Sequence, residues 1–449
     1  MTSSPLVNLS DELRLVIVEI VESEKQCRRD LLNLSSTCRS YRTFLSPNIF
    51  TKVTLRNDEE SGLAIQVFLC SERSIFVKEL HYQGVTVVPA DHVSGDIVEV
   101  EEQEEQATVL SEPTREVLCD LKRFPNLERL TVEFPWRKGD IDVGFYHFEE
   151  VESDVQVLER EEEDTWRALM AKTYAAIGEN KDSSTVKSLD LRGLMARVVS
   201  SWWTVDFQTF LGSLQDFRLS TVAMDNGAGW CQNTHNGYLD FLFQLGDNLT
   251  SHLHAAETLF IAGNNKGPIG CSGMRHALSS LKVKDMPKLR HLHLQYFFLD
   301  PPLIEFIESH IETLETIVLD ECFGTWDHSY QTLASDGYGW KEFFDGIQAK
   351  KPRRLAQFDI TWKNIEFPWD KEYRKIDENS DQVRTGKSLL ESGRLAFMYA
   401  HLDDKYGMLF QDDDANLEQL IGGEDFEAYC RLMVIVKENS AITQSRLES

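Results

Sequence analysis

Apolar residues follow two different periods along this chain. Through the first fifty residues they recur at helical spacing, in two runs separated by a charged stretch at 22–30. A segment this short buries little apolar surface by itself. The pattern predicts a small helical module over residues 1–54, whose apolar face contacts the rest of the chain or another protein. The two runs are Leu9, Leu13, Ile17, Ile20 and Val21, and then Leu31, Leu34, Cys38, Tyr41 and Phe44.

Short strand-like segments follow, with helical stretches between them. Residues 49–55 and 77–82 alternate like strands around a helical stretch at 61–73. A six-residue motif of the type Leu-x-x-Leu-x-Leu then recurs, at separations of about 25 to about 60 residues. Its starting positions are Leu127, Val186, Leu214, Ala256, Leu289, Leu314 and Leu355. Helical patterns lie between these motifs at 165–177, 207–211, 238–245, 303–314 and 340–348.

This alternation predicts an α/β fold in which one strand and one helix form each unit. A single unit cannot bury its apolar face, whereas stacked units share a continuous core. We therefore expect an irregular solenoid over residues 55–365, with its strands parallel along one curved face. A conventional α/β sheet domain is the alternative, because it also alternates strands and helices. Residues 366–449 lose the motif and are predicted to form a helical C-terminal cap, with helices at 388–402 and 424–437.

The net charge of the chain limits the kinds of partner that we expect it to bind. Its 449 residues carry a formal net charge of −28, a field that repels phosphate backbones, so nucleic acid is not an expected partner. Two acidic inserts interrupt the array near 91–113 and 149–164. They are predicted to be solvated loops or disordered segments, with part of the second as the exposed start of a helix. The eight cysteines form no Cys-x-x-Cys pair, which is typical of reduced thiols inside the cell. Without a signal peptide or a membrane-spanning run, we expect a cytoplasmic or nuclear protein with no membrane partner.

Motifs that carry chemistry are absent or incomplete. The ending of a phosphate-binding loop occurs at 386–388, but Asp381 stands where the first glycine is required, and an acid there repels phosphate. The glycine-rich stretch 263–270 fits an ordinary repeat loop. The pairs His252/His254 and His291/His293 lack a third ligand at a suitable spacing. We therefore expect no metal, no cofactor and no catalysis by the chain itself.

The helical module resembles an F-box. That family's pattern opens with Leu-Pro-x-Glu-Leu, continues with aliphatic residues at helical spacing and Asp-Leu-x-x-Leu, and ends with Cys-Arg-x-aromatic-Arg. Ser10 stands in place of the proline and can cap the first helix. The recurring motif behind it resembles the degenerate leucine-rich repeats that often follow an F-box in fungal proteins. The remaining matching residues are Leu9, Glu12, Leu13, Ile17, Ile20, Val21, Asp30, Leu31, Leu34, Cys38, Arg39, Tyr41 and Arg42.

This resemblance implies a substrate-recognition subunit of an SCF-type cullin–RING ubiquitin ligase. The F-box would bind a Skp-type adaptor, and through it a cullin, while the array binds a protein substrate. The expected adaptor-binding residues are Leu9, Leu13, Ile17, Ile20, Val21, Leu31 and Leu34. The alternative is a non-catalytic interaction scaffold, in which the same helices only cap the solenoid.

The expected substrate-binding surface is the exposed face of the parallel strands. Residues that flank the buried leucines in the motif alternate with them and point to that face. They are polar and of mixed charge, which suits a protein or peptide ligand. The predicted substrate-binding residues are Arg129, Asp190, Arg192, Arg218, His291, His293, Gln295, Asp320 and Asp359.

Overall fold

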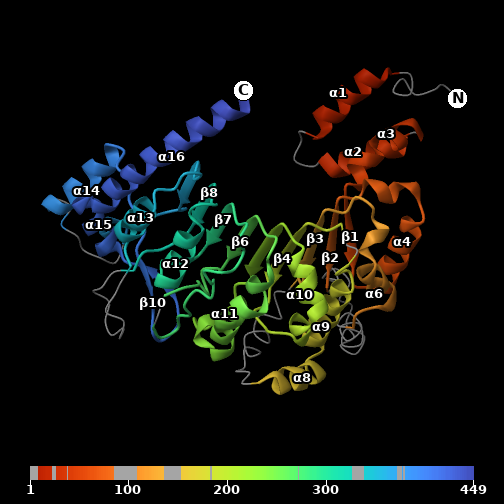
Figure 1. Ribbon diagram of the computed structural model, residues 1–449, viewed down its shortest axis with the longest axis horizontal. Coiled ribbons are helices and arrows are strands. Elements are labelled where there is room, and N and C mark those ends of the chain that lie inside the picture. Colours follow the sequence, from red (N-terminus) through yellow and green to blue (C-terminus); the bar gives the residue numbers. More distant parts are fainter. Residues whose placement is uncertain are drawn as a thin grey trace.

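The computed structural model describes residues 9–22, 27–37, 39–84, 109–135, 153–182, 185–271, 273–325, 338–371, 377 and 380–448. Nine strands of this described part form one parallel sheet, and each strand pairs with the next strand in the chain (Figure 1). The strands are β1 Lys52–Arg56, β2 Glu79–Gln83, β3 Arg129–Glu133, β4 Ser188–Leu194, β5 Asp216–Thr221, β6 Thr258–Ala262, β7 His291–Gln295, β8 Thr316–Asp320 and β9 Gln357–Thr361.

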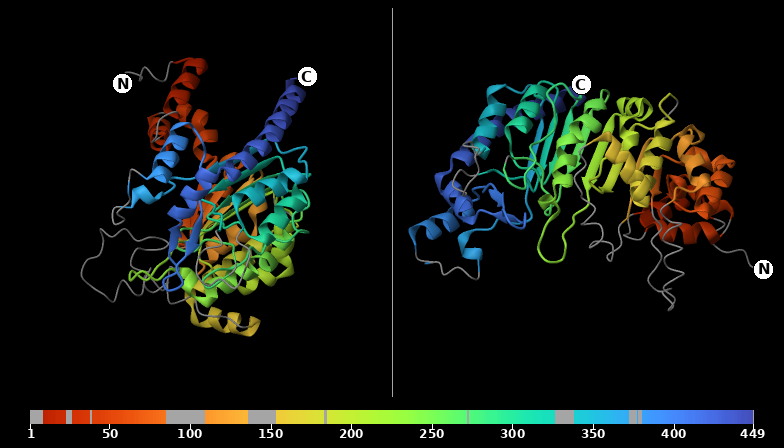
Figure 2. Two further views of the ribbon diagram at one scale, coloured as in Figure 1. Left: turned by 90° about the vertical axis from the view of Figure 1, so that its left-hand side faces the viewer. Right: turned by 90° about the horizontal axis from the view of Figure 1, so that it is seen from below.

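The sequential strand order makes this a solenoid-like α/β fold. A doubly wound sheet reverses its strand order at a switch point, and this sheet does not. The predicted parallel alignment is confirmed. Each recurrence of the six-residue motif contains a strand that begins two residues after the motif does, as at Arg129 and Gln357. Figure 2 shows the strand–helix units following one another along an arc.

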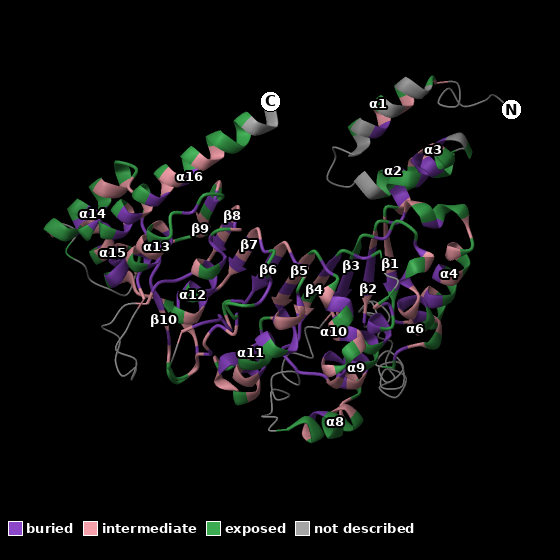
Figure 3. Ribbon diagram, in the orientation of Figure 1, coloured by how far each residue is buried: buried purple, intermediate pink, exposed green. Residues whose placement is uncertain are grey.

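One side of the sheet is packed against helices. Alternate strand residues, among them Leu130, Phe217 and Leu292, point to that side and are buried in a continuous apolar core. Figure 3 shows this buried layer between the sheet and the outer surface of the helices. The helices that follow the strands are α4 Glu59–Leu69, α6 Glu112–Cys119, α8 Asp154–Glu163, α9 Thr165–Gly178, α10 Val205–Gly212, α11 Asn236–Asn248, α12 Pro301–His310 and α13 Trp340–Ala349.

A repeated backbone contact sets the register of the strands. The carbonyl oxygen of the residue before one strand accepts two N–H bonds, from the first residue of the next strand and from the residue preceding it. The Thr51 carbonyl, for example, accepts from Lys78 and Glu79 at 2.8 and 2.9 Å. All eight junctions between neighbouring strands repeat this contact, whatever the length of chain between them. The accepting carbonyls belong to Thr51, Lys78, Glu128, Lys187, Gln215, Glu257, Arg290 and Glu315.

The helical module has a small core of its own. Its helices are α1 Asp11–Glu22, α2 Cys27–Thr37 and α3 Arg39–Phe50, and the buried residues between them are Val18, Leu31, Tyr41, Leu45 and Ile49. The strand predicted over 49–55 is wrong at its start, because Ile49 belongs to this core and α3 continues to Phe50. Contact with the array comes from Phe50, whose ring lies 5.2 Å from that of Phe68. Cys38 of the F-box-like pattern lies outside the described residues.

The C-terminal residues pack against the last strand–helix unit. They form α14 Asp381–Glu391, β10 Ala400–Leu402, β11 Leu409–Gln411, α15 Asp413–Gly422 and α16 Glu424–Glu448, and α16 lies against α13 and β9 (Figure 1). The helix predicted over 388–402 is wrong. Gly393 takes a φ of +86° and donates its N–H to the Leu390 carbonyl, which ends α14, and the buried segment after it forms β10.

The turn between β10 and β11 reaches back to the middle of the array. The Cys231 N–H donates to the Tyr406 carbonyl at 2.8 Å, and the Asn233 side-chain amide donates to the Gly407 carbonyl at 3.0 Å. The ring of Trp230 meets that of Tyr406 edge to face at 5.6 Å. These contacts join the loop after β5 to the C-terminal residues.

Most of the first acidic insert, and the first four residues of the second, lie outside the described residues. Residues 85–108 and 136–152 are not described, whereas 154–163 form α8. The second insert is therefore not a loop over 154–163. It is a helix there, as expected for part of this run, and it is capped at Ser153, whose hydroxyl accepts the Gln156 N–H.

A buried carboxyl group lies where α16 meets α13. Asp425 accepts hydrogen bonds from the Tyr399 hydroxyl and the Lys341 N–H, both at 2.9 Å. Tyr399 also accepts from the Trp340 N–H at 3.2 Å. Burial of Asp425 raises the pKa of its carboxyl group to about 6. The folded protein therefore favours the neutral carboxyl group more strongly than the unfolded chain does.

We expect Asp425→Asn to flatten the pH dependence of stability between pH 4 and pH 6. In the wild type the carboxyl group is protonated below pH 4 in both states, so its contribution is fully present there. The contribution is lost as the pH rises through the folded pKa, and a shift of about two pKa units corresponds to at most about 3 kcal/mol. Urea unfolding at several pH values measures the difference. Equal pH dependence in both proteins would contradict this assignment.

Candidate functional site

The first, third and fifth side chains of each strand face away from the helices, and we call this surface the open face. All nine predicted substrate-binding residues lie on it, on strands β3, β4, β5, β7, β8 and β9. Strand pairing places residues of neighbouring strands side by side in rows. The central row runs through His81, Thr131, Asp190, Arg218, Phe260, His293, Val318 and Asp359.

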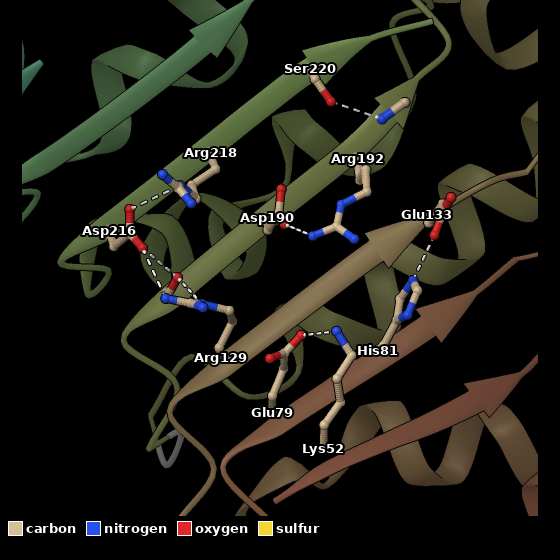
Figure 4. A network of polar contacts seen from close by, with 12 residues as sticks. Lys52, Glu79, His81, Arg129, Glu133, Asp190, Arg192, Asp216, Arg218 and Ser220 are labelled. Atoms are coloured by element: carbon tan, nitrogen blue, oxygen red, sulfur yellow. Dashed lines mark hydrogen bonds and ion pairs between the residues drawn. The ribbon is translucent and has the colours of Figure 1, made fainter. Parts of the chain in front are cut away.

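Arginines gather on the β3–β5 part of the open face (Figure 4). The Asp216 carboxylate lies between two of them, with its oxygens 3.8 Å from Nη2 of Arg129 and 3.9 Å from Nε of Arg218. Ser188 connects this group, because its hydroxyl donates to Asp216 at 2.8 Å and accepts from Nε of Arg129 at 3.2 Å. The Asp216 carboxylate is therefore shared by two guanidinium groups.

Three shorter pairs complete this half of the face. Arg192 donates to Asp190 at 2.7 Å within β4, while His81 meets Glu133 at 2.7 Å and Lys52 meets Glu79 at 2.5 Å across neighbouring strands. The side chains of Arg129, Arg192 and Arg218 remain 45%, 47% and 39% exposed. Pairs this exposed contribute only about 0–1 kcal/mol each to stability.

The β6–β9 part of the open face carries no lysine or arginine. Nε2 of His293 lies 2.8 Å from the Asp320 carboxylate, which also accepts a hydrogen bond from the Thr361 hydroxyl. The Phe260 ring lies between the two halves: the Arg218 guanidinium is 5.2 Å from its centroid, and the His293 ring meets it edge to face at 4.7 Å. The lysines and arginines of the open face thus all lie on β1–β5, whereas its acids lie on both parts.

Phe260 and Asp216 are among the residues of the open face that were not predicted. Phe260 was missed although the motif that starts at Ala256 places it at an outward position, so the alternation alone could have found it. Asp216 was missed because its pairing with two arginines depends on strand register. Thr131, by contrast, points to the same face but is fully buried among its neighbours.

The helical module offers a second candidate surface. Leu13, Val16 and Ile20 are 52%, 48% and 59% exposed and share one side of α1, at i, i+3 and i+7. We call these three residues the α1 patch. Sequence reasoning missed Val16, although it lies one turn from Leu13.

The seven predicted adaptor-binding residues differ in how exposed their side chains are. Leu13 and Ile20 are exposed, and Leu9, Ile17 and Leu34 are half-buried. Leu31 is buried in the core of the module, so its side chain holds the helices together. The side chain of Val21 lies outside the described residues.

The described residues hold no cluster of three His, Cys, Asp or Glu residues that could bind a metal ion. The Cys322 thiol is fully buried, and burial raises its pKa to about 12, so it is not a reactive thiolate. None of the described helices is long and apolar enough to cross a membrane.

Comparison with known proteins adds no family. No family model matches the sequence, and a search of curated proteins finds no match.

We expect the exposed and buried residues of the module to differ sharply on truncation. Leu45→Ala should destabilise the module by about 2–5 kcal/mol, because it leaves a cavity between α2 and α3. Leu13→Ala should change its stability by less than about 0.5 kcal/mol. Amide hydrogen exchange in residues 39–50 measures both effects. Equally faster exchange in the two variants would show that the α1 patch is a packing surface.

Proposed function

We propose that the chain is a non-catalytic receptor of an SCF-type ubiquitin ligase, with the helical module binding a Skp-type adaptor and the open face binding a protein substrate. The single observation that carries the adaptor part of this proposal is the α1 patch. Three large aliphatic side chains lie exposed together on a helix that packs against its own module. An exposed apolar surface of this kind is typical of a docking site.

The arrangement of the module supports docking over capping. Helices that only cap a solenoid turn their apolar stripe toward the first repeat. Among the described helices of this module, α3 makes the main contact with the array, at the 3₁₀ helix Glu72–Phe76, and α1 packs on α2 (Figure 1). The side of α1 that carries Leu13 and Ile20 is thereby left for a partner.

The residues of the module then divide into two roles. The α1 patch supplies the contact with the adaptor, and Leu9 and Ile17 extend it at its half-buried border. The core residues Leu31, Tyr41 and Leu45 hold α1 in place on α2 and α3. Ser10 precedes α1, and its carbonyl oxygen accepts the Arg14 N–H at 3.0 Å, so the helix begins without the proline of the F-box pattern.

The proposed mechanism is one of proximity. The array would hold a substrate on the open face, while the adaptor and cullin bring a ubiquitin-charged enzyme close to it. Linking two binding events raises the effective concentration of the second partner, up to the millimolar range for short connections. The chain contributes position and no chemical step.

An interaction scaffold without a ubiquitin role is the second candidate. The contact that favours it is the packing of α3 on the first unit, where Arg73 lies 5.4 Å from the Phe50 ring and Phe50 meets Phe68. Through these residues the module contacts the N-terminal end of the array, where a cap would lie.

We expect Leu13→Asp with Ile20→Asp to abolish co-purification of a Skp-type adaptor and its cullin. Two buried charges in the interface cannot be compensated by an apolar partner surface. The matched control is Leu63→Asp with Val67→Asp, which places the same charges on exposed aliphatic positions of α4. Affinity purification followed by mass spectrometry measures the association.

Retained adaptor in the α1 variant would exclude docking through this patch. Absence of adaptor and cullin from the wild-type purification would instead favour the scaffold. The control variant must keep the association with the adaptor. Otherwise its loss in the α1 variant cannot be assigned to the α1 patch.

A further inference from the structure

The cations of the open face lie at one end of the sheet. The outward positions of β1–β5 carry five of them, at Lys52, Arg56, Arg129, Arg192 and Arg218, beside the four acids Glu79, Glu133, Asp190 and Asp216. The outward positions of β6–β9 carry the two acids Asp320 and Asp359 and no lysine or arginine. A ligand lying across the strands therefore meets a cation-rich part with a formal charge of +1 (five minus four) first, and a part with a formal charge of −2 later.

The arginines at the positive end keep most of their donors free for a ligand. A guanidinium group has five N–H donors. Arg129 and Arg192 each use one of them, toward Ser188 and Asp190, and the 3.9 Å contact of Arg218 with Asp216 is too long for a hydrogen bond. Guanidinium groups bind carboxylates and phosphates through two parallel hydrogen bonds, so this end suits an acidic group.

The centre of the face is apolar. Phe260 and Val318 are half-buried, with His293 between them in the row. Arg218 and His293 hold the Phe260 ring from two sides, which leaves the remaining ring surface for an apolar side chain. An aromatic anchor in the middle of a polar surface is the usual make-up of a binding hot spot.

The negative end suits a basic group. Asp359 is exposed and accepts one hydrogen bond, from the Gln357 amide at 2.6 Å within its own strand. Asp320 is bonded to His293 and Thr361. With no lysine or arginine among the outward residues of β6–β9, a cation brought by a ligand would be the first full positive charge there.

We infer that the open face binds an extended protein segment that runs across the strands, with an acidic residue at one end, an apolar residue in the middle and a basic residue at the other. Strands lie about 4.8 Å apart and an extended chain advances about 3.3 Å per residue. The step from β5 to β8 therefore spans about four residues, and that from β4 to β9 about seven. The acidic and basic residues of the ligand should be separated by that range.

This inference deepens the proposed function, since it names the class of segment that the open face takes, and it rests on that face being a protein-binding surface. It does not depend on the adaptor. A carboxylate and a phosphate present the same chemistry to the arginines, so the acidic end can come from glutamate or from a phosphorylated side chain.

Labelled synthetic peptides test the inference on the full chain. The first peptide carries Glu-Glu and Lys-Lys separated by five residues with a central leucine. The second shortens the separation to one residue, and the third replaces the glutamates by phosphoserines. Fluorescence anisotropy measures the affinity of each. We expect the first peptide to bind about tenfold more tightly than the second, because only the first reaches both ends of the face.

Charge-reversed variants assign the binding to named residues. Arg192→Glu with Arg218→Glu should weaken the first peptide about tenfold, and a peptide with Lys-Lys at both ends should then bind in its place. Asp320→Lys with Asp359→Lys should give the opposite preference, for Glu-Glu at both ends. The matched control is Arg353→Glu with Arg354→Glu, which changes the charge by the same amount at exposed positions outside the strands.

Each result of these binding measurements leads to a different conclusion. Tighter binding of the third peptide than of the first would assign the acidic end to phosphate. No binding of any peptide by the wild type, equal binding of the first two, or equal weakening by the control variant would overturn the inference. Adaptor co-purification is measured on the same variants. A folded chain keeps the adaptor whichever peptide it binds, so this measurement separates a failure of the inference about the open face from a failure of the proposed function.

Discussion

The fold depends on one repeated backbone contact, in which the carbonyl before each strand accepts two N–H groups from the start of the next strand. The contact uses no side chain, so residues as different as Thr51 and Arg290 can make it, and only proline, which lacks the N–H, is unsuited to donate in it. It fixes where each strand begins, and strand pairing then aligns the outward side chains in rows. The rows of the open face, and the gathering of its cations on β1–β5, follow from that register.

The two candidate surfaces differ in the structure that holds their side chains in place. The open face lies on a sheet whose backbone is fixed at every junction, so side chains as far apart in sequence as Arg129 and Asp216 meet reliably. The α1 patch lies on a helix held by a small core of five buried residues. A rigid polar surface and a small, separately packed apolar surface suit the separate recognition of two partners.

The sequence predicts the array better than it predicts the module. Strand positions follow from a motif of buried aliphatic residues, because such residues must face the helices in a parallel sheet. In α1, aliphatic residues surround the helix, so periodicity could not tell that Val18 is buried while Leu13 and Val16 are exposed. Packing on α2 decides that difference. The end of α14 was missed because it depends on the backbone conformation of Gly393.

The turn that reaches from β10–β11 to the loop after β5 changes how this solenoid can come apart. In a simple repeat array each unit contacts only its neighbours, so the ends fray first. Here Asn233 is bonded to Gly407, 174 positions further along the chain. The units from β5 to the C-terminus are thereby closed into a loop and should open together as one cooperative block. The N-terminal units, outside that loop, keep the gradual fraying of an ordinary array.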